Sequence, residues 1–484
     1  MSESNPRADM RDEPPTQGAD DAPADEHNAT PLPPGRELFA GWPQPELVLV
    51  FTGEQGGYIE PCGCAGLENQ KGGLRRRHTF LKQLHARGWP VVALDNGGII
   101  GRFGREAEIK FDKAVEALRM MGYQAVGFGA EDLKLPTGAV TATAANGEAF
   151  VSANVGLFGF ESGFVPRLRV IEAGGLKVGV TSVLGDSQQE QLTNDEVQLM
   201  PAEKALAQVL PELKKAKCDR LVLLAYAKPE ESRVLAEKFP EFDVVVTAHG
   251  AAEPPHEAQR VGGDGAQFIE VGHKGMYAIV LGLYDDEQAP ERYQRVPLDH
   301  RFADSPEMDE LMVSYQDQLK ELGWQGLGLR RVEHPRGKFA GSDQCADCHQ
   351  RAFEIWQDTP HALATETLTK AKPPRQFDPE CISCHATGWN PQKYLPYTTG
   401  YDSLEKTPGL AGNGCENCHG PGAAHIAAEM AGDEKLQEKL RQAMHLSLEG
   451  ADGEAQRRSC LECHDGDNSP DFDFDTYWPK IAHP

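Results

Sequence analysis

The chain has 484 residues, of which 39% are hydrophobic and 25% are charged, and this length suits about two to four globular domains. Its 48 basic and 74 acidic side chains give a net charge of −26. Nucleic acid is therefore not an expected partner, because phosphate binding needs clustered Lys and Arg. The sequence has no run of about 18 apolar residues, so we predict no transmembrane segment.

Residues 1–43 form an acidic segment rich in Pro, Asp, Glu and Ala, without a repeating apolar face. This composition predicts a disordered tail or tether. The segment lacks both the basic start and the apolar core of a secretory signal peptide.

Residues 44–300 alternate short apolar stretches with amphipathic ones, which predicts an α/β domain. We expect strands at 46–52, 91–94, 125–128, 149–152, 176–183, 221–224, 244–247, 267–271 and 278–283. We expect helices at 74–87, 107–121, 201–215 and 230–238.

Several segments in and after these strands have a recognisable sequence. They are Val-Phe-Thr at 50–52, Tyr-Ile-Glu-Pro at 58–61, Gly-Gly-Leu-Arg-Arg at 72–76, Leu-Asp-Asn-Gly-Gly at 94–98, Phe-Gly-Ala-Glu-Asp at 128–132 and Thr-Ala-His-Gly at 247–250. With them, region 46–290 resembles the calcineurin-like metallophosphoesterases, in particular the 5′-nucleotidase branch. The resemblance implies an α/β sandwich. In that family, such loops hold two metal ions that clamp a phosphate and activate water.

The metal-binding positions of that family are largely absent from this chain. Among the positions that match the family's metal ligands, only His249 is still the residue that the family uses. The other matching positions hold Glu54, Gly56, Gly98, Ala130, Glu131, Tyr226 and Ala251. Because Gly and Ala offer no ligating side chain, we expect no metal site in this domain. The resemblance then predicts a fold without the family's reaction. Residual phosphoesterase or 5′-nucleotidase activity is an alternative.

Cys62 and Cys64 stand in the loop that replaces the first metal-binding loop, shortly before three consecutive arginines at 75–77. Two thiols beside a former active site are candidates for a redox pair or a metal site, and nearby arginines would favour the thiolate. A Cys-x-Cys disulfide closes a small ring and tends to be labile. An ordinary structural disulfide and two buried thiols are the alternatives, and the sequence does not separate them.

Residues 301–339 are expected to form a linker helix and a connector. The helix, at 305–323, starts with Ser305 as N-cap and Pro306 at its first position. Its apolar residues follow a helical stripe, and these are Met308, Leu311, Met312, Tyr315, Leu319 and Leu322. We expect the helix to pack between two domains.

Residues 340–484 contain the pattern Cys-x-x-Cys-His four times, and this pattern is the attachment site of c-type haem. The two thiols add to the two vinyl groups of one porphyrin, and the following His becomes the proximal ligand of the iron. Zinc ribbons also use Cys-x-x-Cys pairs, but they have no reason to place His after every second Cys. We therefore expect four haem c groups. The attachment residues are Cys345, Cys348, Cys381, Cys384, Cys415, Cys418, Cys460 and Cys463, and the proximal ligands are His349, His385, His419 and His464.

The sequence around these motifs resembles the tetrahaem cytochromes of the c-554 type. The likeness rests on Gly-Ser-Asp-Gln at 341–344, Trp at 356 followed by Pro-His-Ala at 360–362, Cys-His-Ala-Thr-Gly-Trp at 384–389, Cys-His-Gly-Pro-Gly-Ala-Ala-His at 418–425 and Tyr-Trp-Pro-Lys-Ile-Ala-His at 477–483. It implies a mainly α multihaem cytochrome c domain, with distal iron ligands at His361, His425 and His483. It also implies that the haem of His385 is open or weakly ligated, and His445 is the competing candidate that would close it.

Two functions follow from this reading. Bis-histidine haems change oxidation state with little change of geometry, which suits an electron carrier, whereas a five-coordinate iron suits binding of a small nitrogen or oxygen species. We favour an electron carrier whose phosphoesterase-like domain serves docking or assembly. A haem redox enzyme, or a substrate reaction at the Cys62 and Cys64 loop, is the alternative.

The acidic composition favours a redox partner that is basic at its docking patch. Covalent haem attachment in bacteria occurs outside the cytoplasm, so we expect a periplasmic or extracellular protein whose export signal is missing from this sequence. The sequence does not indicate an oligomeric state.

Overall fold

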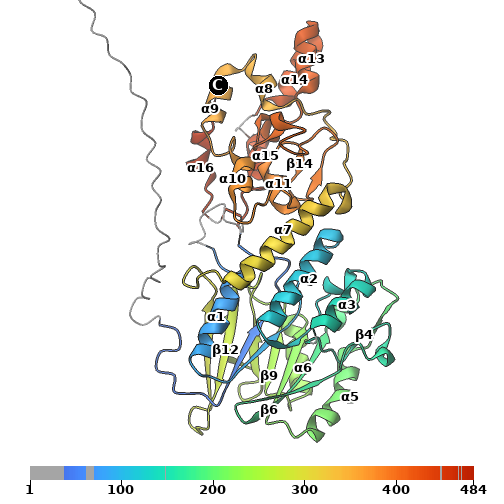
Figure 1. Ribbon diagram of the computed structural model, residues 1–484, viewed down its shortest axis with the longest axis vertical. Helices are drawn as coiled ribbons and strands as arrows, with labels where there is room; N and C mark the ends of the chain where they lie inside the picture. Colours follow the sequence, from blue (N-terminus) through green and yellow to red (C-terminus); the bar gives the residue numbers. More distant parts are fainter. Residues whose placement is uncertain are drawn as a thin grey trace, which may run out of the picture.

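The computed structural model describes residues 37–61, 70–147, 149–446, 450–466, 468–469 and 471–483. Figure 1 shows an α/β part, built from the residues before helix α7 (Pro306–Gly326), and a helical part, built from those after it. Helix α7 runs diagonally from one part to the other.

Two sheets form a sandwich at the centre of the α/β part. One sheet has the strand order β13-β12-β1-β2-β3, and the other has the order β10-β11-β9-β8-β6-β5. Strands β1, β2 and β3 are parallel to one another, as are β6, β8, β9 and β11. The bounds are β1 Leu47–Thr52, β2 Val91–Asp95, β3 Tyr123–Val126, β5 Arg169–Ala173, β6 Leu176–Leu184, β8 Arg220–Tyr226, β9 Val244–Thr247, β10 Gln259–Arg260, β11 Gln267–Glu270, β12 Tyr277–Leu283 and β13 Glu291–Pro297.

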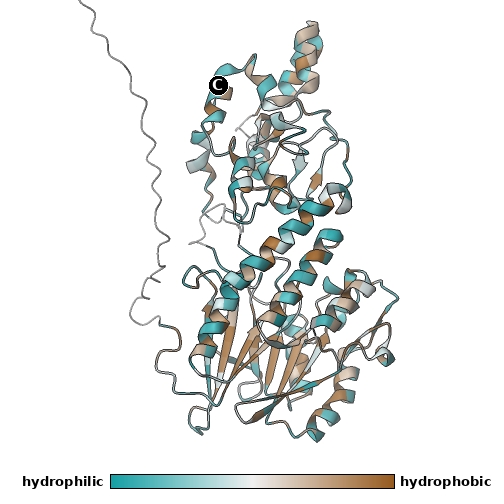
Figure 2. Ribbon diagram, in the orientation of Figure 1, coloured by the Kyte–Doolittle hydropathy of each residue, from teal (hydrophilic) through white to brown (hydrophobic). Residues whose placement is uncertain are grey.

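Apolar side chains fill the space between the sheets, because these strands are near-continuous apolar runs with both faces covered. Phe51, Val180 and Val246 are completely buried there. Figure 2 shows the strands as the most hydrophobic elements of the molecule.

Helices cover the outer faces of both sheets. Helices α1, α2 and α7 pack over the first sheet, and α5 and α6 pack over the second. The bounds are α1 Leu74–Ala86, α2 Arg105–Met120, α3 Thr137–Gly147, α4 Asp186–Gln189, α5 Ala202–Lys215 and α6 Pro229–Lys238. The short strands β4 (Val155–Leu157) and β7 (Val197–Leu199) pair beside α3.

The helical part consists of short helices around a small apolar core. The core residues are Leu368, Ile382, Ala386, Trp389, Tyr401 and Leu410. The strands β14 (Trp389–Asn390) and β15 (Leu395–Pro396) form a two-stranded sheet. The helices are α8 Ser342–Ala346, α9 Gln350–Gln357, α10 Ala364–Lys370, α11 Pro379–His385, α12 Cys415–His419, α13 Ala423–Ala431, α14 Glu434–Met444, α15 Gly450–Cys460 and α16 Phe474–Tyr477.

Most of the predicted elements of the α/β part are present, with ends that differ by one or two residues. The strand predicted at 149–152 is wrong, because only Phe150 forms an isolated bridge there, with Val126. The sequence reading missed β5, β13 and α3. Strand β13 alternates charged and polar residues, and α3 consists mostly of small residues, so neither shows the apolar pattern on which such predictions depend.

Helix α7 packs between the two parts, as its apolar stripe predicts. Ser305 is the N-cap residue, but its hydroxyl bonds the Glu307 carboxylate at 2.7 Å and faces His78 Nδ1 at 2.7 Å. At the other end, the Trp324 ring meets the Trp389 ring edge-on at 5.0 Å, and Trp324 Nε1 donates to the Asp402 carbonyl at 3.0 Å. No helix among the described residues is long and apolar enough to cross a bilayer.

Candidate haem centres and the remodelled cleft

Each Cys-x-x-Cys-His motif lies on a short helix or at its end. The third motif forms helix α12, and the second lies at the C-terminal end of α11. The first motif begins inside α8, and the fourth begins at the last residue of α15. In the first and fourth motifs, the backbone N–H groups of His349 and His464 donate to the carbonyls of Cys345 and Cys460, at 2.8 and 2.9 Å. A single helical turn therefore brings both thiols and the imidazole of a motif to one side of the backbone.

Three of the four proximal histidines face a predicted distal histidine. The ring centroids are 6.3 Å apart for His349 and His425. They are 5.9 Å apart for His361 and His464, and 5.8 Å apart for His419 and His483. Two imidazoles on opposite sides of one metal, each with a metal–nitrogen bond of about 2 Å, would have centroids roughly 6 Å apart. The residues present thus fit a bis-histidine iron in three places.

Hydrogen bonds orient several of these rings. Nδ1 of His419 faces the Met444 carbonyl at 2.8 Å, and Nδ1 of His464 faces the Ser469 hydroxyl at 2.9 Å. Nδ1 of His385 faces the Ala364 carbonyl at 2.7 Å. A ligating histidine uses one ring nitrogen for the metal and gives the other N–H to such an acceptor, which fixes the tautomer. In all three residues, Nε2 is therefore the nitrogen available to iron.

Burial keeps these imidazoles neutral, which is the form that binds a metal. Burial, together with the nearby His464 and His385, lowers the pKa of His361 to about 4. Burial also lowers the pKa of His385, His419 and His464.

His445 lies at the C-terminal end of α14, close enough to His419 to influence its charge. His445 therefore lies near the third motif. The role of His445 as the competing distal ligand for the haem of His385 stays a prediction.

Cysteines of different motifs lie against one another. The thiols of Cys345 and Cys415 are in hydrogen-bond contact, as are those of Cys384 and Cys463. Cys418 is close enough to Cys460 for their charges to interact. The motifs therefore follow one another in space in the order first, third, fourth, second, which the sequence order does not reveal.

The two ends of this series have different surroundings. Cys348 and His349 of the first motif are exposed, whereas Cys384 and His385 of the second are only partly so. Helices α8 and α9 lie at the end of the helical part that points away from the sandwich (Figure 1). Helix α11, which carries the second motif, contacts the α/β part, since Glu380 bonds Lys110 at 2.8 Å.

In the α/β part, the carboxyl ends of the parallel strands meet at the edge that faces the helical part. The Tyr226 ring lies at this edge beside Gly98, where an added Cβ would lie 2.6 Å from Tyr226 Cε2. Burial, and the nearby Asp132, Glu54 and Glu131, raise the pKa of Tyr226 far above its usual value. A neutral phenol therefore fills space that the resembling family gives to a metal ligand.

Glu54 and His249 lie in contact at the same edge, with 3.2 Å between Oε1 and Nδ1. Both residues have a positive φ, 47° and 54°, which is uncommon outside glycine. Among the described residues, no group of three or more His, Cys, Asp or Glu side chains is arranged to hold a metal ion.

Cys62 and Cys64 lie outside the described residues, so their role stays a prediction. Their described neighbour Glu60 accepts hydrogen bonds from Arg375 of the helical part, one of them at 2.8 Å. Sequence reasoning did not identify Arg375, Lys110 or the acceptors of the histidine N–H groups, because nothing in the linear pattern pairs residues so far apart.

The helical part and its four motifs are similar to a c-type cytochrome, and the α/β part has a fold similar to that of phosphoesterases. The family "Cytochrome c554 and c-prime" matches residues 344–420, which implies covalently bound haem c. Cytochrome c-554 of Nitrosomonas europaea is 31% identical over 143 residues, covering 26% of this chain and 57% of that protein. An apyrase of Aedes albopictus is 24% identical over 200 residues, covering 37% of this chain and 34% of that protein. The chain thus spans only part of the length of either relative.

Among solved structures, the sulfate thiohydrolase SoxB of Thermus thermophilus is similar to this chain. The similarity covers 65% of this chain and 68% of that one, with a TM-score of 0.50 and 12% sequence identity. At that identity it shows the fold alone. The predicted fold class and both resemblances are therefore confirmed.

Proposed function

We propose that this protein is an extracytoplasmic electron carrier with four covalently attached haem c groups. The observation that supports it best is the set of three facing histidine pairs, with ring centroids 5.8–6.3 Å apart, at three of the four attachment motifs. When bound, haem supplies one-electron redox chemistry, and the chain holds the imidazoles in place so that little has to move on electron transfer.

We assign His425 as the distal partner of His349. His361 is the distal partner of His464, and His483 that of His419. These assignments are supported by ring separation and by the Nδ1 hydrogen bonds of His419 and His464. The haem of His385 stays open or weakly ligated in this proposal, on the strength of the cytochrome c-554 resemblance.

The contacts between the cysteine thiols support an electron path through the motifs in the order first, third, fourth, second. The path would begin at a redox partner near the exposed His349. Four exposed acids surround that end, with Arg351 as the one exposed cation between residues 343 and 358; the acids are Asp343, Asp347, Glu354 and Asp358. A partner with a basic docking patch is complementary to such a surface.

The α/β part is a docking or assembly lobe in this proposal, and its cleft does no phosphoester chemistry. Tyr226 beside Gly98 supports this role, because its ring stands where a ligand-bearing loop would need room. We divide the chain into a tail at 1–43, the α/β domain at 44–300, a linker at 301–339 and the tetrahaem domain at 340–484. A periplasmic or extracellular location follows from covalent haem attachment.

The test is the full chain, exported and matured with haem. We expect mass spectrometry to show four added porphyrins, and an electron paramagnetic resonance spectrum of the oxidised protein to contain three low-spin signals and one high-spin signal. Alanine at His361, His425 or His483 should each convert one low-spin signal to high-spin. His445→Ala, the matched control, should convert none. A mature protein without added porphyrin would refute the proposal.

The same spectra separate the carrier from the enzyme. A high-spin haem that binds NO or CO and turns over a small nitrogen or oxygen species would establish the enzyme. A high-spin haem that ignores these ligands would establish the carrier.

A further inference from the structure

A buried cluster of charged side chains joins the α/β part to the helix that carries the second haem motif. Lys110 of α2 is only 3% exposed. Its Nζ lies 2.9 Å from Glu106 Oε1 and 2.8 Å from Glu380 Oε2. The Tyr315 hydroxyl of α7 donates to Glu106 Oε1 at 2.5 Å. In Figure 1, α2 and α7 both reach up to the helical part.

The cluster contains more acids than bases. Asp378 is 5% exposed, accepts from Gln316 Nε2 at 3.1 Å and lies near Lys110. Three carboxylates therefore surround one ammonium group, and burying an unbalanced charge is costly unless one group takes up a proton. Burial raises the pKa of both Asp378 and Glu380, although Lys110 opposes this.

The remaining members stay in one charge state. Burial alone would raise the pKa of Glu106, but Lys110 and the Tyr315 hydroxyl outweigh it and lower that pKa. Burial alone would lower the pKa of Lys110, but the surrounding carboxylates raise it, so the lysine is charged. Burial keeps Tyr315 a neutral phenol by raising its pKa. Asp378 and Glu380 are therefore the members of the cluster that can gain or lose a proton.

Other charged groups face the cluster from the elements packed around it. Arg102, in the loop before α2, acts on Glu106 and stacks on the Tyr394 ring at 3.6 Å. Lys274, from the loop between β11 and β12, interacts with Glu380. Burial, together with Glu380, raises the pKa of Tyr394 to about 12. Burial lowers the pKa of Lys274, whereas Asp465 and Glu380 oppose this shift.

The cluster is continuous with the second haem attachment site. Asp378 is the N-cap of α11, where it accepts from the Glu380 N–H at 3.0 Å. Glu380 directly precedes Cys381, and the same helix ends at His385. Tyr394 lies near both Lys110 and Cys384. A charge in this cluster therefore acts on the second motif through protein rather than through bulk water, where it would be screened.

We propose that Lys110, supplied by the α/β part, is a positioning residue that raises the reduction potential of the haem on the second motif, and that the Asp378–Glu380 pair takes up a proton when this haem is reduced. The proposal rests on haem attachment as proposed above. An electron from the redox partner converts ferric to ferrous iron, and a proton from solvent neutralises one carboxylate. Glu380 keeps 34% of its side-chain exposure, which gives that proton access.

This assigns the α/β part an electrostatic role beyond docking. Without the α2 helix of that part, the helix of the second motif would carry two acids and no buried cation from Lys110. The potential of that haem would then be lower and would depend differently on pH.

The test measures the potentials of all four haems in the full chain by spectroelectrochemical titration at pH 6 and pH 8. The haem of the second motif is identified as the one whose signal changes in His385→Met. In Lys110→Met we expect its reduction equilibrium to become at least tenfold less favourable, about 59 mV for one electron. In Glu380→Gln and Asp378→Asn we expect the opposite shift and a weaker dependence on pH.

Lys113→Met is the matched control. Lys113 lies one turn further along the same helix, is 7% exposed, and bonds Glu116 at 3.1 Å instead of the helical part. It should leave all four potentials unchanged. Unchanged potentials in Lys110→Met, or an equal shift in Lys113→Met, would overturn the inference while four haems remain in place. If Lys110→Met does not fold, the two acid variants decide by the sign of their shift.

Discussion

The Tyr226 ring lies so close to Gly98 that a Cβ at position 98 would come within 2.6 Å of Cε2 and 2.8 Å of the hydroxyl oxygen. The two residues depart together from the pattern of the phosphoesterases that the α/β part resembles. An acidic side chain at 98 and a tyrosine at 226 would compete for the same space. We therefore propose that the packing of Tyr226 against Gly98, in addition to the missing ligand types, disfavours a metal ion at this edge of the sheet.

We predict that Gly98→Ala destabilises the protein more than Gly122→Ala, a substitution at a glycine with a similar φ. Gly98 has φ 72° and Gly122 has φ 76°, but nothing lies within 4 Å of a Cβ at Gly122. Left-handed backbone costs an alanine about 1–2 kcal/mol, and overpacking adds about 1–3 kcal/mol at Gly98 alone. Urea unfolding midpoints should thus fall further for Gly98→Ala than for Gly122→Ala. In Gly98→Ala/Tyr226→Ala the overpacking should be relieved, and equal losses in the two single variants would contradict this account.

Asp132 should make stability depend on pH. Its carboxylate accepts from the N–H groups of Gly98, Ile100 and Gly129 at 2.8–3.1 Å, yet burial raises its pKa to about 6. A folded pKa above the unfolded value of about 3.9 means that the native state holds the proton more tightly. The free energy of unfolding should therefore decrease between about pH 4 and pH 6 and then level off, by an amount on the order of 3 kcal/mol at most.

The variant Asp132→Asn isolates this effect, because its amide does not titrate. The difference in free energy of unfolding between the parent and this variant should fall as the pH rises from 4 to 6. Guanidinium titrations at several pH values measure the difference. A difference that is flat across this range would show that Asp132 does not hold a proton in the native state.

The sequence indicated the fold of the α/β part because its buried parallel strands are apolar runs and its loops keep the outline of a family. It also indicated the haem motifs, because the chemistry of attachment needs two cysteines and a histidine at fixed spacing. It did not indicate the order of the motifs in space. The contact of Cys345 with Cys415 joins residues that are far apart in the chain, and it depends on how the short helices pack.

The interface between the two parts was equally inaccessible from sequence. Lys110 looks like an ordinary helix lysine until α11 brings Glu380 to within 2.8 Å of its Nζ. Burial of a polar side chain depends on tertiary contacts rather than on local pattern. The apolar stripe of α7 predicted that one face of the helix would be buried. It did not predict that Trp324 would pack against Trp389 of the helical part.

Trp324 should couple the unfolding of the two parts. Its ring meets Trp389 edge-on and its N–H bonds the Asp402 carbonyl at 3.0 Å. Removing a large packed aromatic side chain costs about 3–5 kcal/mol. We expect Trp324→Ala to separate the Soret transition from the far-ultraviolet transition on heating. Trp324→Phe keeps an aromatic edge and loses only the hydrogen bond, worth about 1 kcal/mol, so its two transitions should stay together. Coincident transitions in Trp324→Ala would show that the coupling lies elsewhere.

The exposed first motif should be the entry point for electrons from a basic partner. Asp347 and Glu354 are exposed on either side of His349. Their neutralisation in Asp347→Asn/Glu354→Gln should slow reduction by a small basic c-type cytochrome, because electrostatic steering raises association rates by about tenfold or more at low salt. Stopped-flow absorbance at two ionic strengths measures the rate, and the difference from the parent should shrink as salt is added.

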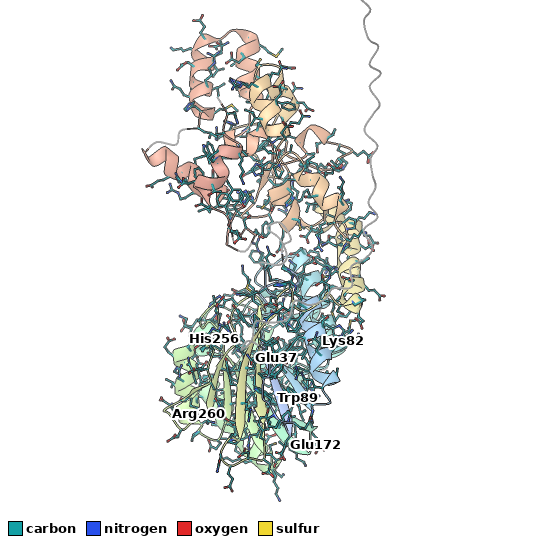
Figure 3. All side chains as sticks on the ribbon, turned by 90° about the vertical axis from the view of Figure 1, so that its left-hand side faces the viewer. Glu37, Lys82, Trp89, Glu172, His256 and Arg260 are labelled. Atoms are coloured by element: carbon teal, nitrogen blue, oxygen red, sulfur yellow. The ribbon has the colours of Figure 1, made fainter. Side chains whose placement is uncertain are left out.

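A pair of acids far from the haems supplies the control. Asp285 and Glu287 are exposed in the turn between β12 and β13. The register of β1 with β12 puts this turn beside Leu47, at the start of β1. In the side view of Figure 3, the helical part stands over one end of the sandwich, and Glu172 lies near the other end. Asp285→Asn/Glu287→Gln changes the net charge by the same amount, so net charge alone predicts equal slowing in both double variants. Slowing that is confined to Asp347→Asn/Glu354→Gln would mean that the partner docks at the first motif, and equal slowing would mean that it is steered by the acidic molecule as a whole.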